Sequence, residues 1–181
     1  MEKTKELIYD VVTDIRYGTV SSKTINKLKR LLKQADAPKE TKYYLAVCYS
    51  MESEHQKAKE LFESLDETLH FPKLFWHWAY NEQFLDKNKA YEIITKGVID
   101  FPKEEQLRQL KTRLATTTDE KLNAHLEYLT AFPTSTEAKK YFLVFLENEQ
   151  KQIDFESLKQ QLDARELDEK FKQRITKLLP K

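Results

Sequence analysis

Apolar residues recur every three or four positions along most of the chain, which is the spacing of one face of an α-helix. The first such stripe consists of Leu7, Ile8, Val11, Val12 and Ile15. A second, beginning after the capping residues Ser21 or Ser22, consists of Ile25, Leu28, Leu31 and Leu32. No segment shows the strict apolar–polar alternation of a β-strand, so the pattern predicts an all-α chain.

Prolines punctuate this helical pattern at nearly regular intervals. Pro38, Pro72, Pro102 and Pro133 are separated by 34, 30 and 31 residues, and the last three follow a phenylalanine. Each interval holds two amphipathic stripes, and a period in the low thirties built from helix pairs is typical of an α-solenoid. Pro38 itself suits the first turn of a third helix. The sequence therefore predicts one domain, residues 1–181, made of about five antiparallel helix pairs and a C-terminal capping helix.

The predicted boundaries follow the prolines and the ends of the stripes. The repeat units are expected at residues 2–37, 38–71, 72–101, 102–132 and 133–163, and the capping helix at residues 165–179.

One unit resembles the tetratricopeptide repeat closely. Leu45-Ala46-x2-Tyr49, Ala58-x3-Phe62 and Pro72 keep the residue types and the spacing of that family. The small residues let two helices approach closely, while Tyr49 and Phe62 fill the space beside them. The resemblance implies a right-handed solenoid whose first helices line a concave groove.

The next unit is similar but less regular. Trp76-x2-Ala79-Tyr80 looks like a first-helix motif, and Ala90-x3-Ile94 with Pro102 looks like a second. The run from Lys89 to Gly97, ahead of Phe101-Pro102, is also similar to half-a-TPR repeats, a subclass found in RNA-processing assemblies, although Tyr91 replaces that subclass's usual arginine.

An aromatic cluster in this second unit is the main candidate for a partner-binding site. If Trp76, Ala79 and Tyr80 face the packed interior, their neighbours must project toward the groove, because adjacent residues point about 100° apart on a helix. The expected groove residues, from two successive units, are Tyr43, Tyr44, Val47 and Met51, and His77, Trp78 and Asn81. Aromatic anchors of this kind hold helical or extended peptides. Burial between units is the alternative.

The overall charge of the chain adds little to the choice of partner. The chain has 31 basic and 30 acidic residues, for a formal net charge of +1, which gives no general attraction to nucleic acid or anionic membrane. A local basic cluster lies on a helix nearly free of acidic residues, and its members are Lys23, Lys27, Lys29, Arg30 and Lys33. This cluster is a candidate contact for an acidic peptide or for RNA, and a solvated helix face is its simpler interpretation.

The sequence offers few residues that could form a catalytic, phosphate-binding or metal-binding site. Only two glycines occur, so there is no Gly-rich phosphate loop, and the four histidines lack the spacing of a metal-binding helix face. Cys48, the only cysteine, falls on an apolar face and is expected to be an inert buried thiol in a reducing compartment. We therefore expect no enzyme activity, no cofactor and no membrane span, and a cytoplasmic location.

Three functional hypotheses remain open from the sequence. The first is a scaffold or adaptor that binds a peptide segment or partner subunit in its concave groove. The second is a half-a-TPR-type RNA-processing scaffold that contacts RNA through the basic helix. In the third, the aromatic residues bury in a homo-oligomer or a larger complex.

Overall fold

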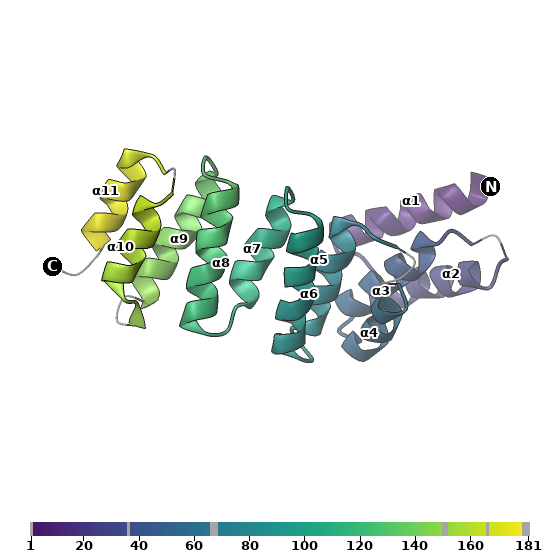
Figure 1. The fold of residues 1–181 in the computed structure, drawn as a ribbon. Helices are drawn as coiled ribbons and strands as arrows, with labels where there is room; N and C mark the ends of the chain where they lie inside the picture. The colour runs from purple at the N-terminus through teal and green to yellow at the C-terminus, as the bar shows by residue number, and fades with distance from the viewer. Residues whose placement is uncertain (1, 36, 66–68, 150–151, 166, 179–181) are drawn as a thin grey trace. The chain divides into compact units, whose positions relative to one another are not determined.

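The computed structural model describes residues 2–35, 37–65, 69–149, 152–165 and 167–178, and within them it contains eleven α-helices and no strand. The helices are α1 (Glu2–Tyr17), α2 (Ser22–Leu32), α3 (Glu40–Met51), α4 (His55–Glu63), α5 (Pro72–Glu82), α6 (Lys87–Asp100), α7 (Glu105–Leu114), α8 (Thr118–Ala131), α9 (Thr136–Glu149), α10 (Phe155–Asp163) and α11 (Glu169–Leu178) (Figure 1). The all-α class is confirmed, and each predicted unit contains two helices.

The chain forms two compact units, residues 1–93 and residues 94–181, with the division inside α6. In the first unit, consecutive helices from α1 to α5 pack against one another, and α3 also contacts α1 and α5. The helix α3 is buried on most sides, and Leu45, Ala46 and Cys48 are among its core residues. Ala46 and Ala58 are completely buried, as the close packing of α3 on α4 requires.

Local capping residues set the ends of the first two helices. Gly18 adopts a left-handed conformation (φ 67°) after α1, which glycine tolerates without a Cβ clash. The hydroxyl of Ser21 accepts a hydrogen bond from the backbone N–H of Thr24 and so caps α2.

The four evenly spaced prolines occupy three different positions. Pro102 and Pro133 lie in equivalent turns, since the N–H groups of Phe101 and Phe132 each donate 2.9 Å hydrogen bonds to carbonyl oxygens of the preceding helix. Pro72 is instead the first residue of α5. Pro38 lies ahead of α3, which begins at Glu40, so its expected place in the first turn of that helix is wrong.

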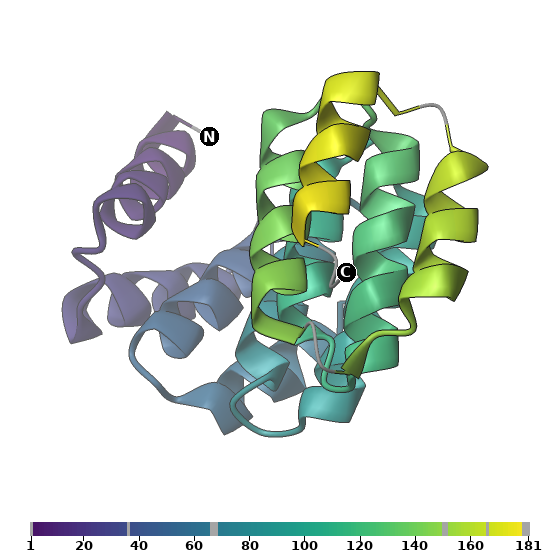
Figure 2. The same ribbon diagram turned by 90° about the vertical axis from the view of Figure 1, so that its left-hand side faces the viewer.

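The second unit is built on α8 and α9, with α7 packed on α8 and α11 packed on α9 (Figure 2). A fourteen-residue cluster that includes Leu126, Phe142, Leu158 and Phe171 forms its core. The hydroxyl groups of Tyr128 and Ser135 both donate to the Glu105 carboxylate, which ties the start of α7 to the α8–α9 turn. In the expected capping segment, positions 166 and 179 lie outside the described residues.

No helix among the described residues is both long enough and apolar enough to cross a membrane.

Candidate functional site

The helices α3 and α5 bury equivalent residues. Leu45, Ala46 and Tyr49 are buried on α3, and Trp78, Ala79 and Glu82 are buried at the same relative positions on α5. The residues of α5 that correspond by burial to Leu45-Ala46-x2-Tyr49 are therefore Trp78-Ala79-x2-Glu82, one residue before the alignment expected from Ala79-Tyr80.

This shift corrects the expected groove residues of α5. Trp78 is only 8% exposed and Asn81 is completely buried, so neither projects into a groove. Trp76 and Tyr80, expected to face inward, are instead partly exposed. The physical reason is that Asn81 and Glu82 have polar partners on α4, which makes burial of that side of α5 favourable.

The other expected groove residues, those of α3 and His77, differ in their exposure to solvent. Tyr43 and Val47 are buried, which corrects their expected exposure to a groove. Tyr44 and His77 are partly exposed, and Met51 is exposed. Tyr44 borders a cavity of about 350 Å³ that residues of α1 and the start of α3 also line.

The outward side of α5 carries three aromatic residues four positions apart, Trp76, Tyr80 and Phe84, which we call the aromatic ladder. The Trp76 and Tyr80 rings stack with centroids 5.2 Å apart and an interplanar angle of 6°. The Tyr80 ring meets Phe84 edge-on at 5.7 Å. Phe84 lies two residues after Glu82, the last residue of α5, and is 55% exposed. The i, i+4, i+8 spacing is visible in the sequence and could have identified the ladder.

The ladder continues onto α3 through His77. The Trp76 ring meets the His77 ring edge-on at 5.0 Å, and the His77 ring meets Tyr43 edge-on at 5.6 Å. The Tyr43 ring also contacts Phe71, the N-cap residue of α5, at 5.0 Å. The ladder, His77 and Phe71 thus form one aromatic surface, and the buried Tyr43 joins it to α3.

Hydrogen bonding fixes the orientation of His77. Its Nδ1 lies 2.8 Å from the Lys73 carbonyl oxygen, and because a carbonyl only accepts, Nδ1 must carry the proton. The Tyr43 hydroxyl oxygen, 2.9 Å from the same nitrogen, is the second acceptor of a shared hydrogen bond. Burial lowers the pKa of His77, so the ring is neutral near pH 7 and Nε2 is a hydrogen-bond acceptor.

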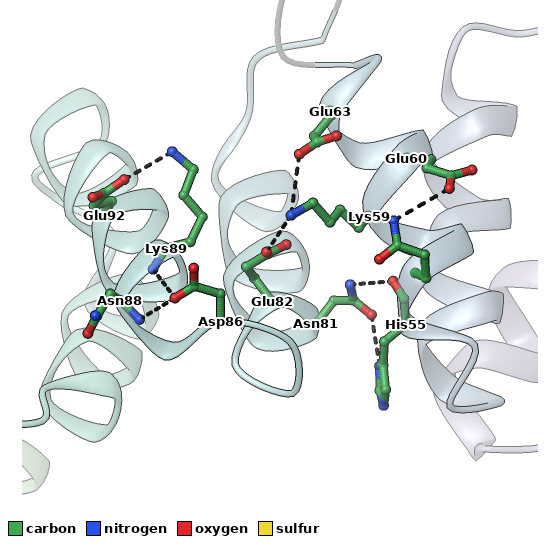
Figure 3. Close-up of polar contacts among 11 residues, drawn as sticks. His55, Lys59, Glu60, Glu63, Asn81, Glu82, Asp86, Asn88, Lys89 and Glu92 are labelled. Carbon is green, nitrogen blue, oxygen red and sulfur yellow. Dashed lines mark hydrogen bonds and ion pairs between the residues drawn. The ribbon is translucent and has the colours of Figure 1, made fainter.

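Two contacts from α4 support the other end of the ladder (Figure 3). The Asn81 amide nitrogen donates to the His55 carbonyl oxygen at 3.0 Å, and His55 Nδ1 donates to the Asn81 amide oxygen at 2.9 Å. The oriented His55 ring then stacks on Phe84 with centroids 4.4 Å apart. Asn81 is thus a buried support for the exposed Phe84 and not itself a groove residue.

An ion pair with a buried carboxylate joins the same two helices. Lys59 Nζ of α4 lies 2.9 Å from a carboxylate oxygen of Glu82, which is almost completely buried, and 3.7 Å from Glu63 (Figure 3). Removal of Lys59 would leave the buried Glu82 carboxylate without this cation, so the pair favours one arrangement of α4 against α5.

The basic helix α2 is more engaged with the rest of the unit than the sequence indicates. Lys27 forms an ion pair with Asp10 of α1 at 3.5 Å, and the Lys29 ammonium group lies 5.3 Å from the centroid of the Tyr49 ring. Lys23, Arg30 and Lys33 are exposed. The five cations therefore do not all face an outside partner.

Two further candidate chemical groups, Cys48 and His125, are buried. Burial raises the pKa of the Cys48 thiol to about 12, as expected of an inert core cysteine. His125 is buried against Phe142 and Phe145, and burial lowers its pKa to about 4. Among the described residues, no group of three or more His, Cys, Asp and Glu side chains is placed to hold a metal ion.

Neither the protein-family models nor the curated proteins nor the solved structures searched contain a match to this chain.

Proposed function

We propose that the protein is a non-enzymatic scaffold that binds a protein segment on the outward face of α3 and α5. The observation that carries the proposal is the aromatic ladder. A stacked pair, Trp76 and Tyr80, leads to Phe84, whose ring remains more than half exposed although it is held in place by His55. Rigid aromatic side chains bind with a small loss of conformational entropy, which makes them the commonest anchors of protein interfaces.

As the framework we propose a tetratricopeptide-like, right-handed solenoid of about five pairs with α11 as a C-terminal cap. The packing of consecutive helices supports a helical repeat. The repeated positions of Ala46 and Ala79 are the strongest argument for this repeat. A single buried cysteine fits a reducing compartment, and we propose a cytoplasmic location.

An RNA-processing role is a weaker alternative. Its candidate contact was the basic helix, and two of the five cations on α2 have partners within the first unit. A phosphate backbone gains most from several free cations acting together.

Selection of binders from a random phage-displayed peptide library on the immobilised full chain tests the proposal. Enriched peptides should bind the wild-type protein and lose at least tenfold in affinity for Trp76→Ala and Phe84→Ala. Ile99→Ala is the matched control, because Ile99 is an exposed apolar residue outside the ladder. If no peptide depends on Trp76 or Phe84 while both variants keep their helicity, the proposal is wrong.

A further inference from the structure

The helices α3 and α5 run in the same direction, which places their N-terminal ends together. The chain reverses in the short turn between α3 and α4, and α4 is antiparallel to α5, because His55 at the start of α4 bonds Asn81 near the end of α5. Tyr43 and His77, which contact each other, each lie four residues after a lysine, Lys39 and Lys73. Both lysines therefore lie about one helical turn beyond this contact, at one end of the aromatic surface.

This end of the surface is basic. Lys39 and Lys73 are exposed, and neither forms an ion pair with a carboxylate of the described residues. The Lys73 ammonium group is near enough to His77 to contribute to the lowering of the pKa of that ring, after the larger effect of burial. The N-cap residues of α3 and α5, Lys39 and Phe71, make no side-chain cap, so no side-chain cap offsets the partial positive charge of either helix end.

Glu40, the acidic residue next to Lys39 in the sequence, does not face this end of the aromatic surface. Glu40, in the first turn of α3, lines the cavity that Tyr44 also borders, and its charge raises the pKa of Tyr44, second to burial. It therefore lies on the α1 side of α3. At the opposite end of the surface, the C-cap residue of α3 is the exposed Glu52.

The aromatic ladder between these ends spans about 12 Å, since Phe84 lies eight positions after Trp76 and the rise per residue is about 1.5 Å. Same-face side chains recur about every 6–7 Å in both a helix and an extended segment. Two or three apolar side chains of a peptide can therefore cover the ladder in either conformation. The charges at its ends, and not its length, distinguish one peptide from another.

We propose that this surface binds a peptide with a cluster of two or three apolar or aromatic residues next to a cluster of carboxylates, with the carboxylates at the Lys39 and Lys73 end. This inference rests on the proposed function and names the chemistry of its partner. A polyanion such as RNA fits less well, because its charge is uniform, whereas the C-cap residue of α3 is the acidic Glu52.

The composition of the selected peptides tests this inference. Ladder-dependent peptides should be enriched in Asp and Glu on one side of their apolar residues. Synthetic copies should bind the Lys39→Glu/Lys73→Glu variant about three- to tenfold more weakly, the range expected for two exposed ion pairs. Glutamate is favourable in the first turn of a helix, so this variant should keep its fold.

Two controls make the result specific. Lys33→Glu makes the same kind of charge reversal at the C-cap residue of α2 and should leave the affinity unchanged. Peptides with Lys in place of the selected Asp and Glu should recover affinity for the doubly substituted variant.

The two proposals fail in different ways. Peptides that need Trp76 but show no acidic bias and no effect of Lys39→Glu/Lys73→Glu would overturn this inference and leave the proposed function standing. Absence of any ladder-dependent peptide would overturn the proposed function. A fluorescein-labelled oligouridylate that binds the wild-type chain and loses affinity for Lys39→Glu/Lys73→Glu would replace the peptide with a nucleic acid.

Discussion

Nδ1 of His77 lies 2.9 Å from the hydroxyl oxygen of Tyr43, which joins the first helices of two successive pairs, α3 and α5. The same nitrogen donates to the Lys73 carbonyl oxygen, so one imidazole connects both helices and supports the edge of the Trp76 ring. The arrangement orients the aromatic surface.

Substitution of the two tryptophans should destabilise the protein to different extents. Trp78→Ala removes a buried side chain and should lower the free energy of unfolding by about 3–5 kcal/mol. Trp76→Ala removes a partly exposed ring and one stacking partner and should cost about 0.5–1.5 kcal/mol. Urea denaturation followed by circular dichroism measures both. An equal or greater loss for Trp76→Ala would show that the assigned register of α5 is wrong.

Asn81 should be a stabilising residue. Asn81→Ala leaves the ring N–H and the carbonyl oxygen of His55 without their partner and should cost about 1–3 kcal/mol. Asn88→Ala is the control, because Asn88 is exposed and the bond drawn to it in Figure 3 uses its backbone N–H. Thermal melts of the two variants give the comparison, and matching melting temperatures would argue against the role given to Asn81.

His125 should make the stability of the second unit, residues 94–181, decrease at acid pH. Its pKa is about 4 in the folded protein against 6.5 in the unfolded chain, so the unfolded state binds more protons between these values. The contribution of neutral His125 to the free energy of unfolding is fully present above pH 6.5. It is lost as the pH falls to about 4, and the total loss is about 3 kcal/mol. Urea denaturation at a series of pH values measures the slope.

His125→Leu provides the control for this effect, because leucine fills a similar apolar site between Phe142 and Phe145 and does not titrate. The variant should lose the part of the slope that lies between pH 6.5 and pH 4. The same slope in the wild type and in His125→Leu would assign the acid sensitivity to other groups.

Cys48 should be unreactive in the folded protein. The thiol is buried, and its raised pKa leaves almost no thiolate at pH 8. An aromatic disulfide reagent should label it only as fast as the first unit opens, and fully and quickly in concentrated guanidinium chloride. Rapid labelling of the native chain would contradict the burial of α3.

The number and pairing of the helices could be predicted from the sequence because they depend on local periodicity and capping. The burial of Cys48 followed from the same pattern. The register of α5 could not be predicted in this way. Phe75, Trp76, His77 and Trp78 are all bulky, so the apolar pattern alone does not identify the buried side.

Polar residues decide that register. Asn81 and Glu82 are buried because His55 and Lys59 on α4 bond to them, and those partners lie more than twenty residues earlier in the chain. Spacing within one helix carries no information about such contacts. The regular spacing of the prolines likewise did not predict where each lies relative to its helix. Pro38, Pro72 and Pro102 occupy different positions.

The most direct test of the central claim uses the fact that the chain has only two tryptophans. A ¹H–¹⁵N NMR titration of the full chain with a selected acidic–apolar peptide follows both indole N–H signals. The Trp76 signal should shift in proportion to binding, and the Trp78 signal should stay in place because its ring is buried. A peptide that binds while the Trp76 signal stays fixed would contradict the assignment of the aromatic ladder as the binding surface.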